Sequence, residues 1–140
     1  RKALSPALRT LAPKKINEDV AVPVSRLPAL IDAIEGLSAR HAVPIVHFGH
    51  AGNGNIHTNL MVDPAVEGQL ERSRQCLSEV FDRVIARSGP ISGEHGAGLE
   101  KQPFGPRETD PATLAVMRRI KQTLDPHGIL NPGKLFPPVT

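Results

Sequence analysis

The sequence contains few aromatic residues and no long block of charges of one sign. Among its 140 residues there are four Phe, no Trp and no Tyr, so the hydrophobic core must be built from aliphatic side chains. Aromatic residues are too scarce to form a base-stacking platform and no run of five or six like charges occurs, which together disfavour nucleic-acid binding. The formal net charge of +3 is mildly basic and suits a small anionic ligand better.

Cysteine is nearly absent as well. The single Cys76 excludes an internal disulfide framework and a cysteine-rich zinc site, and its helical surroundings predict a half-buried structural thiol. No apolar run approaches the roughly 18 residues that span a bilayer, and no signal peptide is evident. We therefore expect a soluble protein in the cytoplasm, or peripherally at the inner membrane. Because the first residue is Arg1, we expect the chain to be part of a longer protein.

The histidines, by contrast, are concentrated. Segment 47–59 holds three of the six, together with three glycines and three asparagines. Apolar runs flank it at 43–46 and 60–62, a pattern that is typical of two strands joined by a sharp turn. The sequence therefore predicts a β-hairpin that turns at Gly52 and Asn53.

The register of this hairpin decides which imidazoles can meet. A turn at this place pairs His50 with Asn55, and side chains alternate between the two faces of a sheet. We therefore expect His50, His57 and Asn59 on one face, with His57 diagonal to His50. His47 falls on the other face with the apolar residues.

Two converging imidazoles suit a divalent metal of the zinc or manganese type. A second glycine-rich turn at 93–98 contains Glu94 and His95. Two interpretations remain open for this turn: a surface loop, or a site loop in which Glu94 completes a His-His-Glu metal triad. The sequence signatures of common hydrolases and of nucleotide-binding loops are missing.

Hydrophobic periodicity predicts an α+β fold, with helices on one face of an antiparallel sheet. We expect Lys14 and Lys15 in a loop and Ser25 as a helix cap. The expected elements are a helix at 1–11, a strand at 19–25, a helix at 26–40, the hairpin at 43–63, a helix from 64 to 87, a short strand at 91–92 and a helix at 111–124.

Three motifs carry a family resemblance. GHAGNGNIHTN (49–59), SGEHGAG (92–98) and DPHGILNPGKLF (125–136) resemble the C-terminal region of the FAD-linked oxidases, within the vanillyl-alcohol oxidase superfamily. This family includes D-lactate dehydrogenase, the glycolate oxidase D subunit and D-2-hydroxyglutarate dehydrogenase. The resemblance covers nearly the whole chain, and the one departure noted is Asn53, where many members have Asp.

The resemblance implies the ferredoxin-like half of the FAD-linked oxidase cap domain. Residues 1–128 would form the C-terminal part of that cap domain, and residues 129–140 would be a tail returning to an FAD-binding domain outside this chain. The implied activity is oxidation of a D-2-hydroxy acid to the 2-oxo acid, with hydride transfer to FAD. The electron acceptor stays unidentified, and a homo-oligomer is compatible with the family.

The resemblance also assigns roles to individual residues. It implies a divalent metal (Zn or Mn) on three ligands, a base, contacts to the substrate and contacts to the flavin. The metal ligands would be His50, His57 and Glu94, and the base would be His95. The residues that contact the substrate would be Asn59, Arg1, Ser5 and Lys15, with Lys14 an alternative to Lys15. The residues that contact the flavin would be Asn131 and Lys134. The alternatives are a metal-dependent hydrolase that uses the same triad and a non-catalytic module of the same fold. If the first interpretation holds, the chain alone should be inactive.

Overall fold

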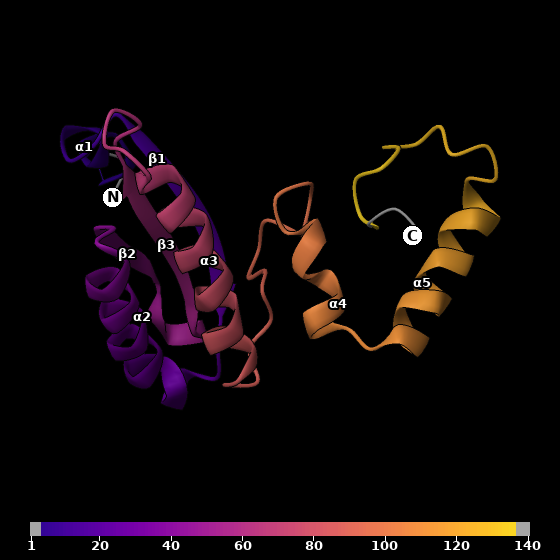
Figure 1. Ribbon diagram of the computed structural model, residues 1–140. Helices are drawn as coiled ribbons and strands as arrows, with labels where there is room; N and C mark the ends of the chain where they lie inside the picture. The colour runs from indigo at the N-terminus through magenta and orange to yellow at the C-terminus, as the bar shows by residue number, and fades with distance from the viewer. Residues whose placement is uncertain (1–3, 137–140) are drawn as a thin grey trace. The chain divides into compact units, whose positions relative to one another are not determined.

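The structure is a computed structural model that describes residues 4–136, with side chains from Pro6 onward. The chain divides into two compact units, the first ending at Glu94 and the second beginning at His95 (Figure 1). The sheet and the two long helices that pack on it belong to the first unit. This unit holds His50, His57 and Glu94.

The sheet has three antiparallel strands, with β3 (Asn55–Val62) between β1 (Lys14–Ala21) and β2 (Ile45–His50). The short 3₁₀ helix η3 (Ala51–Asn53) turns the chain from β2 to β3. Gly54 ends this turn at φ +75°, and a Cβ there would lie 1.9 Å from the carbonyl oxygen of Val22. Only glycine fits this position, because both the backbone angle and the space exclude a side chain.

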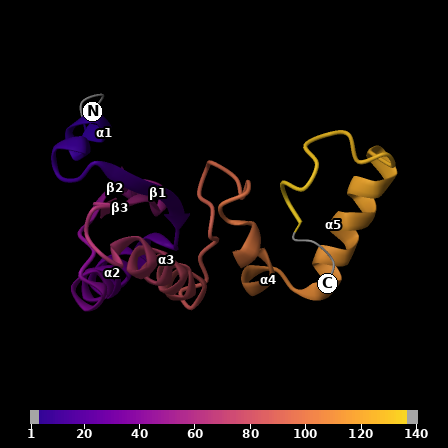
Figure 2. The same cartoon turned by 45° about the horizontal axis from the view of Figure 1, so that its top comes forward.

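Helices α2 (Leu27–His41) and α3 (Gln69–Ile85) pack on each other and cover one face of the sheet (Figure 2). Their apolar faces meet aliphatic side chains of the central strand, so the core is mostly aliphatic, as the composition predicts. Burial of each such side chain stabilises the fold by about 1.5–3 kcal/mol. Side chains that are less than 2% exposed in this core include Leu30, Ile34, Leu60, Val62, Val80, Val84 and Phe81. The predicted α+β class is confirmed.

Several shorter elements complete the chain. In the first unit these are α1 (Leu4–Ala7), η1 (Leu8–Thr10) and η2 (Val24–Arg26). In the second unit they are η4 (Gln102–Phe104), α4 (Gly105–Glu108) and the longer α5 (Pro111–Leu124). The side chain of Asp110 accepts hydrogen bonds from the N–H groups of Ala112 and Thr113 and so caps α5.

The predicted position of the first strand was wrong. The sequence suggested residues 19–25 with Lys14 and Lys15 in a loop, but β1 begins at Lys14 and ends at Ala21. The reason is pairing along the whole of β3, which aligns Lys14 with Val62 and Ala21 with Asn55. Cross-strand pairing fixes the ends of a strand more strongly than the local residue preferences do.

Three further local predictions were also wrong. Ser25 lies inside η2, and α2 begins without a side-chain cap. Residues 91–92 form no strand. The long helix starts at Gln69 instead of residue 64, because Gly68 adopts φ +70°, which is incompatible with a right-handed helix.

Within residues 4–136, no helix is both long enough and apolar enough to cross a membrane.

Candidate metal centre

His50 and His57 lie on the same face of the hairpin. Their register pairs His50 with Asn55 and Phe48 with His57, which makes the two histidines diagonal neighbours, as predicted. The centroids of the two imidazole rings are 5.7 Å apart and the rings meet at 77°. Phe48 packs beside His57 with a ring separation of 5.5 Å and limits how that imidazole can turn.

Glu94 completes the cluster from a separate loop. Its Oε1 lies 3.3 Å from Nε2 of His57 and 3.9 Å from Nε2 of His50. One potential ligand atom from each of the three residues lies within 4.8 Å of the other two. The geometric prediction that two glycine-rich turns bring these side chains together is therefore confirmed.

This donor set fits a divalent metal ion. Two ligands at about 2.1 Å from a tetrahedral zinc are roughly 3.4 Å apart, close to the separations from Glu94 to the two imidazoles. Two imidazoles and one carboxylate leave further coordination positions for a substrate. The side chain of His57 is 13% exposed, whereas those of His50 and Glu94 are 34% and 47% exposed. The cluster is thus supported by the sheet on one side and accessible on the other.

The loop that carries Glu94 is attached to β1 at two points. The N–H of Ala21 donates to the carbonyl oxygen of Pro90 at 3.4 Å, and the N–H of Glu94 donates to the carboxylate of Asp19. Asp19 is fully buried and pairs with His57 in the sheet. Asp19 is not among the predicted site residues, although an acidic residue next to the apolar Val20 is a sequence signal for it.

Asn59 occupies the same face of β3 and is fully buried. Its Nδ2 donates to the carbonyl oxygens of Val46 at 3.2 Å and of His57 at 3.3 Å. These two bonds fix the orientation of the amide group. Its Oδ1 is buried and accepts no hydrogen bond from the described residues. Oδ1 of Asn59 is therefore a hydrogen-bond acceptor that has no donor among the described residues.

The remaining predicted residues belong to β1, to the N-terminal segment or to the second unit. Lys15 lies in β1 opposite Met61 and shares a face with Asp19. Arg1 lies outside the described residues, and only the backbone of Ser5 is described, within α1. The other three, His95, Asn131 and Lys134, belong to the second unit.

His47 lies on the helix-covered face, as predicted. It pairs with Thr58, and its Nδ1 is 3.5 Å from the hydroxyl oxygen of Thr58. Its Nε2 is buried without a hydrogen-bond partner among the described residues. Burial lowers the pKa of His47, and the negative charge of Glu35 opposes this effect only in part. The neutral imidazole is therefore favoured in the folded chain.

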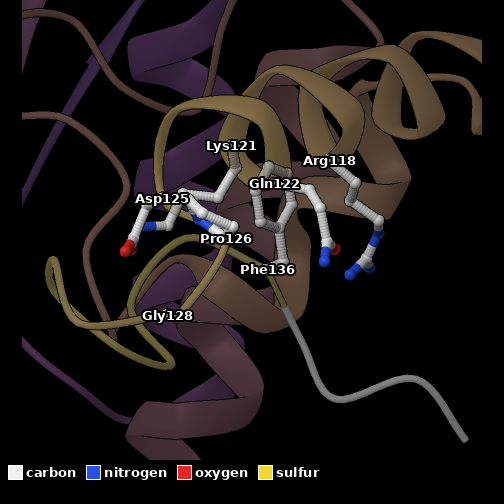
Figure 3. A pocket seen from close by; sticks show the side chains of 7 residues that line it. All are labelled: Arg118, Lys121, Gln122, Asp125, Pro126, Gly128 and Phe136. Carbon is white, nitrogen blue, oxygen red and sulfur yellow. The ribbon is translucent and has the colours of Figure 1, made fainter.

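The second unit contains a shallow pocket between α5 and the segment that follows it (Figure 3). Its volume is about 300 Å³. The guanidinium carbon of Arg118 lies 4.8 Å from the ring centroid of Phe136, and Lys121 pairs with Asp125. Gln102 donates to the carbonyl oxygens of Gly133 and Phe136 and holds this segment in place. The polar groups of the pocket thus serve mainly to fold the segment back on α5.

The fold and the cluster together define an α+β domain with a candidate metal centre on the face of its sheet opposite the helices. Comparison with known proteins identifies the family. The chain belongs to the family of the FAD linked oxidases, C-terminal domain, whose model matches residues 1–135.

Its relatives include three curated enzymes. The chain is 39% identical to glycolate oxidase subunit GlcD of Bacillus subtilis, with 97% of this chain and 29% of the relative covered. It is 38% identical to the mitochondrial D-lactate dehydrogenase [cytochrome] of Arabidopsis thaliana, covering 86% and 21% respectively. It is 35% identical to D-2-hydroxyglutarate dehydrogenase of Stutzerimonas stutzeri, covering 86% and 27%. The chain thus spans less than a third of the length of each of these relatives.

Proposed function

We propose that this chain contributes the metal and substrate side of an FAD-dependent dehydrogenase that oxidises a D-2-hydroxy acid to the 2-oxo acid. The observation that carries the proposal is the convergence of His50, His57 and Glu94 within 4.8 Å, in a chain of the FAD-linked oxidase family. Relatives are named for glycolate, D-lactate and D-2-hydroxyglutarate, which are all 2-hydroxy carboxylates, and this supports the proposed substrate class.

The reaction removes a proton from the hydroxyl group and a hydride from C2, which leaves a carbon–oxygen double bond. A divalent metal, Zn or Mn, held by His50, His57 and Glu94 would supply Lewis acidity that polarises the hydroxyl and carboxylate oxygens of the substrate. FAD, bound mainly outside this chain, would supply the hydride acceptor. His95 follows Glu94 directly in the chain and takes the hydroxyl proton in this proposal. General base catalysis of this kind contributes about 10²–10⁴-fold to the rate.

Substrate contacts are assigned to residues on or near β1 and β3. Lys15 shares a face of β1 with Asp19, the cross-strand partner of His57, and places a cation on that side of the sheet. A cation there suits the carboxylate of a 2-hydroxy acid, to which Arg1 and Ser5 are also assigned. Asn59 would supply an acceptor for a substrate donor. Because Asn59 is fully buried, this contact requires the residues that cover it to move.

The segment after α5 is assigned to the flavin side. Residues 129–140 would form a tail toward the FAD-binding region, with Asn131 and Lys134 close to the flavin. Asn131 adopts a left-handed backbone conformation at φ 47°, which asparagine tolerates better than most residues do. The electron acceptor that reoxidises the flavin would be supplied by a separate partner.

The test uses the visible spectrum of the full-length protein. We expect a flavin spectrum that bleaches in the absence of oxygen when a D-2-hydroxy acid is added. Removal of the metal by a chelator should abolish the bleaching, and added Zn²⁺ or Mn²⁺ should restore it. The substrate panel should contain D-lactate, glycolate and D-2-hydroxyglutarate, with L-lactate as the matched control.

Substitution of the proposed base separates binding from chemistry. His95→Ala should reduce the rate of bleaching by about 10²–10⁴-fold while metal binding persists, because the three ligands are unchanged. A colourless full-length protein that hydrolyses esters or amides would instead support the hydrolase interpretation. A protein with neither flavin nor metal would support the non-catalytic one.

A further inference from the structure

The position of the Glu94 carboxylate depends on where the backbone places this residue. Its side chain is 47% exposed, so packing does not hold it, and it reaches His57 and His50 from a loop outside the sheet. Glutamate has three rotatable side-chain bonds, and an exposed side chain loses rotamer entropy when it is held in one place. The direction of its carboxylate is therefore determined largely by where the chain places its Cα.

The backbone of Glu94 is held by Asp19. This carboxylate is fully buried in the middle of β1, accepts the N–H of Glu94 and lies beside His57 across the strand pair. One side chain thus links the strand next to a metal-ligating histidine to the loop that carries the third ligand. The connection joins residues 75 positions apart in the sequence.

Gly93 allows the loop to approach the sheet closely. A Cβ at Gly93 would lie 2.6 Å from Oδ1 of Asn55, a residue that is itself 5% exposed. Atoms at that separation overlap, so a larger residue would push the loop away from the strand or displace Asn55. The loop therefore packs against β3 at Gly93 and is hydrogen-bonded to β1 through the N–H of Glu94.

A buried carboxylate is a costly way to hold a loop. Transfer of a carboxylate from water into a protein interior costs free energy unless hydrogen bonds and charges compensate for it. The N–H of Glu94 provides part of this compensation. A cation held by His50, His57 and Glu94 would provide more, because His57 is the cross-strand neighbour of Asp19. The buried position of Asp19 is therefore consistent with a role in the site.

We propose that Asp19 is a positioning residue for the metal centre, whose buried carboxylate holds the Glu94 backbone so that the Glu94 side chain meets His50 and His57. This inference rests on the proposed function only in requiring that the cluster binds a divalent metal. Outer-shell residues that orient metal ligands typically contribute about 10–100-fold to metal affinity. Asp19 should do the same without touching the metal.

The experiment measures Zn²⁺ affinity of the full-length protein by competition with a chromophoric chelator. Asp19→Ala should weaken binding by about 10–100-fold, whereas Asp19→Asn, which keeps an acceptor oxygen at the same place, should bind within a few-fold of the wild type. Ser73→Ala is the matched control, because Ser73 is also fully buried and its hydroxyl donates to a backbone carbonyl oxygen far from the cluster in the sequence. The control should lower the melting temperature without changing the Zn²⁺ affinity.

A fourth variant, Glu94→Ala, distinguishes the two proposals. If Glu94→Ala weakens Zn²⁺ binding but Asp19→Ala does not, the positioning role is overturned and the metal site stands. If Glu94→Ala leaves Zn²⁺ binding unchanged, the metal site itself is wrong and the role of Asp19 falls with it. Should Asp19→Ala not fold, Asp19→Ser replaces it under the same criteria, because its shorter side chain leaves the Glu94 N–H out of reach.

Discussion

His47 makes the stability of the chain sensitive to acid. Burial lowers its pKa in the folded state, whereas in the unfolded chain a histidine titrates near ~6.5. Below about pH 6.5 the unfolded chain therefore binds more protons than the folded chain, so stability is full above this pH and is lost as the pH falls toward the folded pKa. The buried Nε2 has no partner among the described residues to accept its proton, which is consistent with this direction.

A comparison with His47→Gln tests this expectation. The variant cannot gain a charge at this position, so its urea midpoint should fall less between pH 7.5 and pH 5.5 than that of the wild type. All other residues are the same in the two proteins, so their contributions cancel in the comparison. Equal falls in the two proteins would show that protonation of His47 does not contribute to acid sensitivity.

The residues of the candidate site that belong to a local sequence pattern could be predicted from the sequence. His50 and His57 follow from the parity of one hairpin, and Glu94 follows from the second glycine-rich turn together with the family motif. Asp19 does not belong to either motif. Its importance depends on a hydrogen bond to a backbone group 75 residues away, which no local periodicity reveals.

Among the elements, the hairpin has a second glycine, besides Gly54, whose replacement should be severe. A Cβ at Gly49 would lie 2.3 Å from the carbonyl oxygen of Asn55 and 2.8 Å from Cα of Ile56, both backbone atoms of the neighbouring strand. Backbone in a paired strand cannot move aside, so Gly49→Ala should separate β2 from β3 next to both histidines. We expect a loss of about 1–3 kcal/mol in the free energy of unfolding, together with weaker metal binding.

Gly52→Ala is the matched control for this change. Gly52 lies in the turn of the same hairpin, but nothing lies within 4 Å of a Cβ built there. Its unfolding free energy, measured by urea titration, and its Zn²⁺ affinity should both stay near the wild-type values. If the two variants behave alike, close approach of the strands at Gly49 is not what holds the hairpin together.

Helix α5, whose start signals are local, was predicted well, whereas strand β1, whose ends are set by pairing with β3, was not. The bounds of α5 match the prediction because Asp110 caps its first turn and Pro111 is favoured at a helix start. The bounds of β1 do not, because they are set by contacts with β3 that lie about 40 residues further along the chain. The prediction of the hairpin was confirmed because its two strands and its turn are contiguous in the sequence.

At the scale of the whole molecule, the chain carries the ligands of the candidate metal centre but covers only 29% of the Bacillus relative. The described residues include the candidate metal centre and part of the segment that we propose for the flavin side. In the relatives, the remaining length leaves ample room for a flavin-binding region. Metal binding and hydride transfer should therefore be separable properties, the first carried by this chain and the second requiring the longer protein.

The isolated chain provides the corresponding test. We expect no oxidation of D-lactate, glycolate or D-2-hydroxyglutarate by the 140 residues with added FAD and Zn²⁺, measured with an artificial electron-accepting dye. The physical reason is that hydride transfer requires C2 of the substrate and the flavin to be held in contact at a defined angle, and free FAD has no such restraint. The full-length protein in the same assay serves as the positive control, and its activity would show that the dye and substrates are adequate. Turnover by the isolated chain would mean that its 140 residues bind and orient the flavin themselves, which would move the flavin site from outside this chain to within it.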